Sequence, residues 1–251
     1  AVTMWLVLDN LFYLFNFSYI GTAIAAGLML YQQKKRYARN IVQFAVGLYM
    51  LVYLGFLCRE NMQIEGFWYY LFLGVFEAAV IHYVVAKIFG PLLFGRGWCG
   101  YACWTAMILD LLPFKEPSAP RRRWGMIRYF VFGISLVFVS LLFILQVPNK
   151  EDIMWWSFLI GNVLYYVVGI AVAYQCKDNR AFCKYICPIT VFLKPMSYFS
   201  LFRIKVDEKK CVSCGICEKV CPMDVDVPSN SRKKKHATEC ILCMKCIEEC
   251  P

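Results

Sequence analysis

Long apolar stretches separated by short polar segments dominate the hydrophobic pattern of this chain of 251 residues. A helix needs roughly 20 mostly apolar residues to cross a lipid bilayer. Five stretches approach that length, at about 11–31, 41–57, 67–89, 127–147 and 155–175. A soluble domain of this size has no core that could bury five such helices. The pattern therefore predicts an α-helical integral membrane protein with about five transmembrane helices.

The composition agrees with this interpretation, because 60% of the residues are hydrophobic and only 18% are charged. The first ten residues carry no basic segment and continue directly into the first apolar stretch, which fits a cleaved signal peptide poorly. The chain begins with Ala1 and ends with Pro251 inside a motif, so we expect both ends to be trimmed.

Basic residues are concentrated in two of the four connections between these stretches. The connections after the first and third stretches contain Lys34, Lys35, Arg36, Arg39, Arg96, Lys115, Arg121, Arg122, Arg123 and Arg128. The connections after the second and fourth contain one each, Arg59 and Lys150. Short loops rich in Lys and Arg stay in the cytoplasm. We therefore expect the N-terminus outside a prokaryotic inner membrane, and everything after residue 176 in the cytoplasm.

The formal net charge of +10 is then a topology signal and does not indicate a nucleic-acid-binding protein. The run RKKK at 232–235 predicts a solvated loop. Docking of an acidic partner or of anionic lipid is the weaker interpretation of this run.

The C-terminal tail contains two copies of a cysteine motif. It reads CVSCGICEKVCP from residue 211 and CILCMKCIEECP from residue 240, so each copy has the spacing C-x2-C-x2-C-x3-C-P. This spacing is typical of bacterial ferredoxins with two iron–sulfur clusters. Disulfides are disfavoured in the cytoplasm, and paired zinc sites would not require two such runs ending in proline. We expect a small α+β dicluster ferredoxin domain at 201–251 after a transmembrane domain at 1–200.

Crossed ligation, in which the fourth cysteine of each run binds the other cluster, assigns the ligands of the two [4Fe-4S] clusters. Cluster 1 is expected to bind Cys211, Cys214, Cys217 and Cys250, and cluster 2 to bind Cys240, Cys243, Cys246 and Cys221. Gly215 lies where the backbone has to turn closely around sulfur. Two clusters in one small fold would form a relay for single electrons.

Two further cysteine pairs follow the third and fifth apolar stretches and form an internal repeat. The segment GRGWCGYACW at 95–104 aligns with NRAFCKYICP at 179–188, with an Arg, an aromatic residue, a Cys, a Tyr and a Cys at fixed offsets. Both stretches are expected to run from outside to inside, so both pairs should emerge on the cytoplasmic side. The cysteines are Cys99, Cys103, Cys183 and Cys187.

Residues four apart lie on one face of a helix, so each pair could present two sulfurs to a common point. Four thiolates would suit a third iron–sulfur cluster or a soft metal ion, with Cys176 as a candidate fifth ligand. The alternatives are a packing role for buried cysteines and a redox-active dithiol pair. Arg96 and Arg180, three residues before the first cysteine of each pair, would offset thiolate charge or serve as basic anchors at the membrane surface.

These motifs, in this order, resemble the polyferredoxin membrane proteins that include the NapH subunit of periplasmic nitrate reduction, the C-terminal half of NosR and the oxidase assembly factor CcoG. The resemblance covers roughly residues 67–251. In that family both membrane-side pairs are usually C-x3-C-P, whereas Trp104 replaces the first proline here. The resemblance implies electron transfer between a membrane donor, often quinol, and a partner redox protein.

The chain contains two histidines, His82 in the third apolar stretch and His236 in the tail. They are expected in different compartments, which excludes a haem with two histidine ligands from one chain. Intramembrane ionisable residues are functional candidates by default, and His82 follows Glu77 in the same stretch. We expect this pair to serve either a quinone-binding or proton-handling site, or a buried hydrogen bond between helices.

The sequence thus predicts an iron–sulfur electron-transfer subunit that works in an oxidoreductase complex. We find no nucleotide-binding fingerprint and no acid–base constellation that would mark a substrate site of its own. The first alternative is a metal reductase or assembly factor, in which the membrane-side thiols receive copper. The second is a non-enzymatic iron–sulfur sensor or scaffold.

Overall fold

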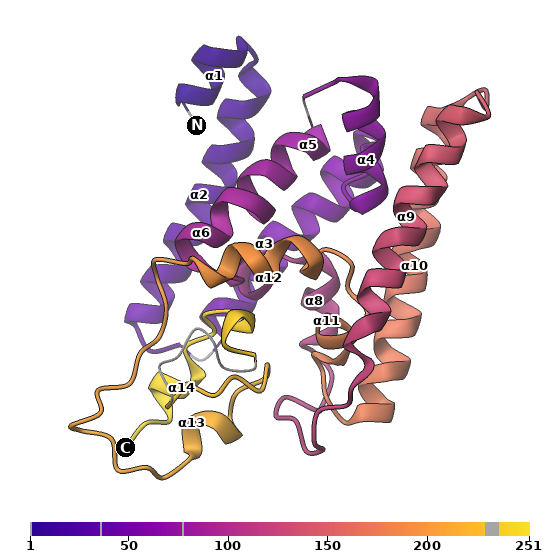
Figure 1. Cartoon of the computed structure of the whole chain (residues 1–251). Coiled ribbons are helices and arrows are strands. Elements are labelled where there is room, and N and C mark those ends of the chain that lie inside the picture. Colours follow the sequence, from indigo (N-terminus) through magenta and orange to yellow (C-terminus); the bar gives the residue numbers. More distant parts are fainter. Residues whose placement is uncertain (1, 36, 77, 229–235) are drawn as a thin grey trace.

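The protein is mostly helical in the computed structural model, which describes residues 2–35, 37–76, 78–228 and 236–251. Its two termini lie at opposite ends of a bundle of tilted helices (Figure 1). The bundle consists of α1 (Val2–Leu8), α2 (Leu11–Gln32), α3 (Ala38–Leu48) with its π-helical continuation η1 (Tyr49–Leu57), α4 (Ile64–Leu73), α5 (Ala78–Tyr83) with η2 (Val84–Phe89) and α6 (Gly90–Phe94), the short turn η3 (Trp124–Met126) leading into α9 (Ile127–Ile144), and α10 (Lys150–Cys176).

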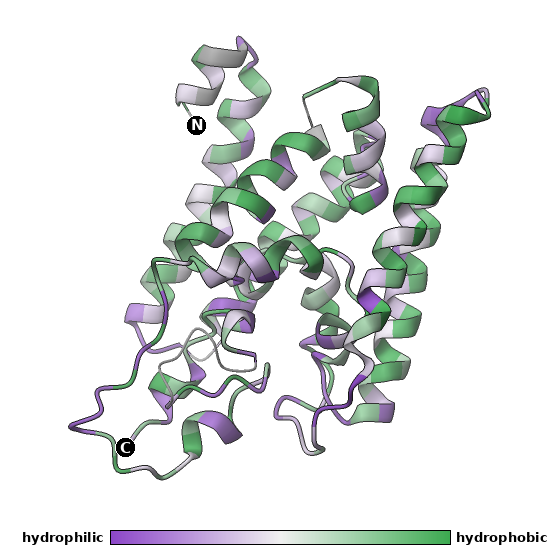
Figure 2. Ribbon diagram, viewed as in Figure 1, coloured by the Kyte–Doolittle hydropathy of each residue, from purple (hydrophilic) through white to green (hydrophobic). Residues whose placement is uncertain are grey.

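Among the described residues, four helices are long and apolar enough to cross a membrane. They span Leu11–Gln32, Ala38–Leu57, Trp124–Ile144 and Lys150–Cys176. Hydrophobic residues cover these helices, whereas hydrophilic residues gather near their ends and in the tail (Figure 2). Ile144 and Ile160 are 73% and 63% exposed, which lipid favours and water does not. The helices expected at 11–31, 41–57, 127–147 and 155–175 are confirmed, and the chain is a membrane protein.

The third apolar stretch, expected as one span at 67–89, is not a single helix. Helix α4 ends at Leu73, Gly74 follows with a φ of 72°, and α5 begins at Ala78. Glycine adopts this left-handed conformation without the steric penalty of a Cβ atom and so ends the helix. The rest of the stretch belongs to a shorter apolar helix, Ala79–Phe94. The expectation of one continuous helix is therefore wrong, and the total of about five crossings stays a prediction.

The segment before α4 turns back into the bundle. Arg59 pairs with Asp152 at 2.8 Å near the start of α10, and the Asn61 side chain donates to the Met154 carbonyl at 2.9 Å. Residues 61–63 are each 2% exposed. Irregular backbone at membrane depth is tolerated where protein buries it. Helix α4 then packs against α9 and α10 and forms a hairpin with α5 (Figure 1).

The elements that carry the repeated cysteines lie toward the end of the bundle opposite the N-terminus (Figure 1). They are α7 (Gly97–Tyr101), α8 (Trp104–Leu109), α11 (Ala181–Tyr185) and α12 (Thr190–Tyr198). Helix α8 packs against α3 and α10, and α12 packs against α6 and η2. The two repeats therefore meet near the end of the bundle where the tail lies.

The C-terminal tail has little regular structure. Its helical elements are α13 (Ile216–Lys219), η4 (Ala237–Glu239) and α14 (Lys245–Glu248). The tail residues that the structure describes contain no strand, so the small α+β fold expected there stays a prediction. The basic run at 232–235 lies outside the described residues.

Candidate functional site

The cysteines of the two repeats occupy equivalent local structures. Cys99 lies in the one-turn helix α7 and Cys183 in the one-turn helix α11. Each helix ends two residues before the second cysteine of its pair. Cys103 is extended, with a ψ of 117°, and Pro188 disfavours helical backbone at Cys187. The expectation that each pair shares one face of one helix is therefore wrong.

The four thiols nevertheless gather in one buried region. Cys99 and Cys183 are 7% and 6% exposed and belong to one hydrophobic cluster, with Cys103 packed against it. Burial raises the pKa of the Cys183 thiol; Arg180 opposes this, while the nearby Cys187, Cys103 and Cys99 raise the pKa further. Burial also raises the pKa of Cys103 to about 11, and Cys99 contributes to this rise. Thiols that perturb one another lie close together, so the repeat brings its four cysteines to one place.

Cys176, the candidate fifth ligand, lies apart from these four. It packs with Ala181 and Tyr185 in a different buried cluster. The charged residues that act on it electrostatically are Arg122, Asp178 and Lys184 rather than another cysteine. The structure therefore does not bring Cys176 into the site.

The arginine of each repeat binds the cysteine backbone of the other repeat. Arg180 donates from Nη1 to the Cys99 carbonyl at 3.0 Å, and Arg96 donates from Nη2 to the Cys183 carbonyl at 3.4 Å. Both arginines are 1% exposed. This exchange holds the two repeats together, so these arginines are not surface anchors.

Each of these arginines has a buried carboxylate partner that the sequence analysis missed. Asp110 accepts from Arg180 at 2.5 Å and from Arg39 at 2.8 Å. Burial alone would raise the pKa of Asp110, but Arg180 and Arg39 outweigh it and hold the pKa below its ordinary value of 3.8. A carboxylate this close to two guanidinium groups stays ionised at neutral pH.

Glu239, the residue before Cys240, has four cations around its carboxylate. Glu239 is fully buried. The distances from its carboxylate oxygens to the nearest side-chain nitrogens are 2.7 Å for Arg121, 3.2 Å for Lys194, 3.6 Å for Arg96 and 3.7 Å for Arg128. Burial would raise the pKa of Glu239, but Arg96, Arg121 and Lys194 lower it to about 2. Positive charge therefore exceeds negative charge beside the four thiols, an arrangement that suits an anionic group.

Two buried lysines add to this charge pattern, and neither was singled out from the sequence. Lys184 lies 2.6 Å from both Asp178 and Asp224, so it links the second repeat to the tail. Lys87, which is 3% exposed in η2, lies within electrostatic reach of Cys99, Cys103 and Cys187. In the described part of the chain Lys87 forms no ion pair with a carboxylate. Its side chain therefore lies near thiols and not near a carboxylate.

In the tail, the structure brings together the four cysteines expected around cluster 2. Burial, together with the nearby Cys243, Cys240, Cys221 and Cys217, raises the pKa of Cys246 to about 12. Burial likewise raises the pKa of Cys240 to about 11, with contributions from Cys221 and Cys243. Cys221 comes from the first motif and the others from the second, which is the crossed arrangement that the spacing predicts.

The cysteines expected around cluster 1 lie at the surface. Cys211, Cys214 and Cys250 are exposed, whereas Cys217 is half-buried and has Cys214 among its charged neighbours. Gly215 adopts a φ of 72° directly before α13. The turn expected from Gly215 is therefore present, but no contact shows Cys250 beside its three expected partners.

The loop of cluster 2 packs directly against the first repeat. The backbone N–H of Arg96 donates to the Cys240 carbonyl at 3.3 Å, and the Tyr101 hydroxyl donates to the Leu242 carbonyl at 2.9 Å. A Cβ atom on Gly100 would collide with the Ile241 carbonyl, so only glycine permits this approach. The four repeat thiols and the cluster 2 thiols therefore belong to neighbouring sites, with Met223 and Ile241 between them in the same hydrophobic cluster.

The donor set fits iron–sulfur clusters by its chemistry. Both the repeat site and cluster 2 offer four thiols, the ligands that [4Fe-4S] clusters bind. The repeat site is enclosed by apolar side chains and has cationic neighbours, which favours a bound anionic cluster. Among the described residues, no three candidate ligands already surround a common point at metal-bonding distance. The fit therefore rests on donor type, number and surroundings.

His82 and Glu77 do not emerge as a pair. Glu77 lies outside the described residues. The His82 ring packs edge-on against Trp98 at 5.3 Å between centroids, and its buried Nε2 has no hydrogen-bond partner in the described part of the chain. A hydrogen bond from Nε2 to a neighbouring helix is thus not seen among the described residues, and a quinone or proton role for this pair stays a prediction.

Comparison with protein families matches both kinds of cysteine motif. A 4Fe-4S dicluster domain matches residues 203–251, and a 4Fe-4S binding domain matches twice, at residues 79–126 and 160–207. The double match confirms the internal repeat. Together, the four long apolar helices and these domains define a membrane-embedded ferredoxin-type protein.

The chain is similar to ferredoxin-type electron transport proteins, and the resemblance to NapH and NosR is confirmed. YccM of Escherichia coli, named as an electron transport protein, is 35% identical over 70% of this chain and 54% of its own length. The ferredoxin-type protein NapH of Haemophilus influenzae is 24% identical over 66% of this chain and 63% of its length. The regulatory protein NosR of Stutzerimonas stutzeri is 26% identical over 62% of this chain and 23% of its length. The chain therefore matches less than two thirds of the length of each of these three relatives. No solved structure matches the chain significantly.

Proposed function

We propose that the protein is the iron–sulfur electron-transfer subunit of an oxidoreductase complex, with three [4Fe-4S] clusters in a row. The observation that carries this proposal is the close packing of two four-thiol sites. The repeat site lies against the loop of cluster 2, through Met223 and Ile241. Neighbouring clusters pass single electrons between them, so the chain can relay electrons rather than transform a substrate.

The third cluster of the proposal binds Cys99, Cys103, Cys183 and Cys187. Each thiolate and each sulfide of a cluster adds negative charge, which a buried site has to offset. Lys87, among the thiols, supplies positive charge, and so do the arginines of the two repeats. The apolar cluster around the site restricts water and so tunes the reduction potential.

The same geometry supports an order for the relay. Cluster 2 is the inner cluster of the tail, because its loop packs on the first repeat. Cluster 1 is the outer cluster, because Cys211, Cys214 and Cys250 are exposed. An aqueous redox partner would therefore dock at cluster 1, in the cytoplasm if the loop charges set the orientation as expected. The membrane donor in this proposal is a quinol, as the resemblance of this chain to the polyferredoxin membrane proteins suggests.

Iron analysis tests the third cluster. Anaerobically purified protein should contain about twelve irons per chain with three cubes and about eight with two. Cys183→Ser should lower the larger figure toward the smaller one. Cys176→Ser is the matched control, because it removes another buried cysteine that lies outside the site. It should leave the iron content and the low-temperature EPR spectrum unchanged.

Other results would contradict the proposal in different ways. About eight irons in fully loaded wild-type protein, with Cys99 and Cys183 open to alkylation, would favour a dithiol site. About eight irons together with copper retained at the same thiols would favour the metal reductase or assembly factor, since four thiols also suit a soft metal ion. Cys214→Ser and Cys243→Ser should each remove or convert one tail cluster without preventing membrane insertion.

A further inference from the structure

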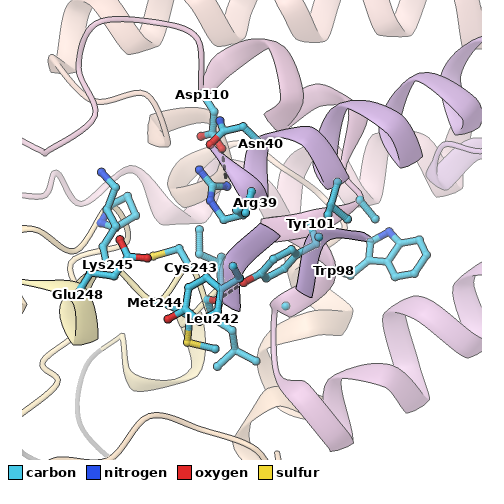
Figure 3. A pocket seen from close by; sticks show the side chains of 18 of the residues that line it. Arg39, Asn40, Trp98, Tyr101, Asp110, Leu242, Cys243, Met244, Lys245 and Glu248 are labelled. Atoms are coloured by element: carbon cyan, nitrogen blue, oxygen red, sulfur yellow. Dashed lines mark hydrogen bonds and ion pairs between the residues drawn. The ribbon is translucent and has the colours of Figure 1, made fainter. Parts of the chain in front are cut away.

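A cavity of about 700 Å³ lies between the membrane helices and the tail. Its walls come from α2, α3, the first repeat and the loop of cluster 2, and the last three contribute the side chains labelled in Figure 3. Ligand sites in proteins commonly have volumes of roughly 300–1,000 Å³. The cavity is thus large enough for a ligand, and no step of the proposed relay uses it.

The cavity extends along α2 from the middle of the helix to the end that lies beside the tail. Ile20, Ile24, Leu28 and Tyr31 of this helix line it. At a rise of about 1.5 Å per residue, Ile20 and Tyr31 lie roughly 16 Å apart along the helix axis. This length is close to half of a hydrocarbon core of roughly 30 Å. The wall along α2 is therefore about as long as one lipid leaflet is thick.

The part of this wall inside the membrane is apolar and open to the bilayer. Ile24 and Leu28 are 44% and 60% exposed, whereas Ile20 and Val46 line the cavity as buried residues. Exposed apolar side chains on a membrane helix face lipid. A hydrocarbon chain could therefore pass from the bilayer into the cavity beside α2.

The end of the cavity beside the tail holds more buried cations than anions. Arg180 is buried, and Arg39 and Lys245 are half-buried (Figure 3). Both arginines share one carboxylate, Asp110, and Arg180 also acts on the Cys183 thiol. Arg39 makes its hydrogen bonds through Nη1, so its Nη2 has no partner among the described residues. Arg39 and Lys245 therefore remain available for an anionic ligand.

The other charged groups that line the cavity are exposed to water. They are Lys35, Lys115, Glu116, Glu248 and Glu249. Water and salt screen exposed charges, whereas charges shielded from water act more strongly. In the described part of the chain, none of the lysines that line the cavity forms an ion pair with a carboxylate. The less exposed cations thus determine that the inner part of this end favours negative charge.

We propose that the cavity binds an anionic phospholipid, with its phosphate at Arg39 and Lys245 and one acyl chain along Ile24 and Leu28. Basic pockets between transmembrane helices on the cytoplasmic side bind the headgroups of anionic lipids. The lipid would bridge α2 and the loop of cluster 2, since both line the cavity. The proposal is independent of the proposed function, because no electron passes through the lipid.

Binding of phosphatidylglycerol to the purified holoprotein in detergent, measured by native mass spectrometry beside phosphatidylcholine, tests the headgroup site. Lys245→Gln removes one cation of the cavity. Lys219→Gln is the matched control, because Lys219 is an exposed lysine of the other tail motif and lies outside the cavity. We expect one tightly bound phosphatidylglycerol per chain in the wild type, about fivefold weaker binding to Lys245→Gln and unchanged binding to Lys219→Gln.

Leu28→Trp tests the acyl chain without changing a charge or a thiol. It narrows the apolar part of the cavity, and Leu11→Trp is its control, an exposed leucine of the same helix outside the cavity. We expect Leu28→Trp, but not Leu11→Trp, to weaken phosphatidylglycerol binding about fivefold while the iron content stays that of the wild type. Because Leu28→Trp keeps every cation, this loss would assign the site to a lipid rather than to a free phosphate ion.

Equal affinity of the wild type for phosphatidylglycerol and phosphatidylcholine would overturn the proposal. Binding that neither Lys245→Gln nor Leu28→Trp weakens would also overturn it, as would displacement of phosphatidylglycerol by a decyl-tailed benzoquinone. Iron analysis separates this proposal from the proposed function. About eight irons in wild type that binds phosphatidylglycerol as expected would reject the third cluster and support the lipid site. About twelve irons without this binding would do the reverse.

Discussion

At the scale of single residues, the site depends on buried ion pairs between segments far apart in the chain. Arg180 and Arg39 meet at Asp110, so one carboxylate ties the second repeat and α3 to the first repeat. Breaking a buried pair by removing one partner leaves an uncompensated charge and costs far more than breaking an exposed pair. The carboxylates are therefore the sensitive members of these networks.

Asp110→Asn should destabilise the protein by about 3–5 kcal/mol, because the buried Arg180 and the half-buried Arg39 lose their only described carboxylate partner. Asp152→Asn is the control, since Asp152 pairs with Arg59 at the surface, where a salt bridge contributes about 0–1 kcal/mol. Equilibrium unfolding in detergent measures both changes. Similar losses for the two variants would show that the Asp110 network does not stabilise the fold.

The stabilisation by Asp110 should depend on pH. Its pKa is lower in the folded protein than the ordinary value of 3.8, because Arg180 and Arg39 outweigh the effect of burial. A carboxyl group whose pKa is lowered by folding stabilises the folded state at pH values above its pKa in the unfolded chain. This stabilisation is lost as the pH falls through its pKa in the folded protein. The difference in stability between wild type and Asp110→Asn should thus stay constant above about pH 5 and shrink below about pH 4. A difference that grows on acidification would contradict this assignment.

Lys87→Gln should lower the reduction potential of the third cluster. A reduced cluster carries one more negative charge, which a nearby positive charge stabilises, so loss of the Lys87 charge should make reduction less favourable. Lys150→Gln, at the far end of α10 from the site, is the control. EPR-monitored redox titration measures both variants. Equal potentials in the wild type and both variants would place Lys87 too far from the cluster to act on it.

The sequence was sufficient to predict the cysteines but not their charged partners. Cysteine spacing is a local property, so the repeat at Cys99 and Cys183 and the tail motifs could be identified directly. Asp110 and Glu239 resemble ordinary loop residues, because their partners come from distant segments that only the folded chain brings together. A lysine in an apolar stretch, Lys87, was the one available signal, since ionisable residues inside a span are functional candidates.

At the scale of helices, hydropathy identified where apolar helices lie but not how they are divided. The stretch at 67–89 is continuous in hydropathy, yet it contains the end of α4, a turn and the start of α5. Only the conformation of Gly74 and the packing of α4 on α9 and α10 reveal the hairpin. A hydrophobic stretch therefore predicts burial in lipid or protein, and does not fix the number of crossings.

Gly66→Ala should destabilise this hairpin. Gly66 lies in the first turn of α4, where a Cβ atom would collide with the Asn61 carbonyl of the buried segment before the helix. Overpacking of this kind costs about 1–3 kcal/mol. Gly133→Ala in α9 is the matched control, because nothing lies within 4 Å of its added Cβ atom. Thermal unfolding should show a loss for Gly66→Ala alone; equal melting temperatures would mean that α4 can shift away from the segment before it.

At the scale of the whole molecule, the fold places the tail against the same end of the bundle as both repeats (Figure 1). Lys184 with Asp224, and Arg96 with Glu239, bridge the bundle and the tail. The Arg96–Glu239 bridge is buried and the Lys184–Asp224 bridge is partly buried, so both hold the tail against the bundle. The proposed relay would therefore need no movement of the tail relative to the bundle.

The last prediction concerns the topology of the whole chain. The turn between α4 and α5 lies at the same end of the molecule as the turn between α9 and α10 (Figure 1). Cys58 is exposed and would react itself, so the test uses protein with Cys58→Ser. A membrane-impermeant thiol reagent added outside intact cells should then reach a cysteine introduced at Val75 or at Asn149. It should not reach a cysteine introduced at Ser118. A single helix at 67–89 would place Val75 in the middle of the bilayer, where no such reagent reaches it. Labelling at Asn149 but not at Val75 would support a single helix at 67–89. Labelling at Ser118 would show that the orientation is opposite to the one expected from the loop charges.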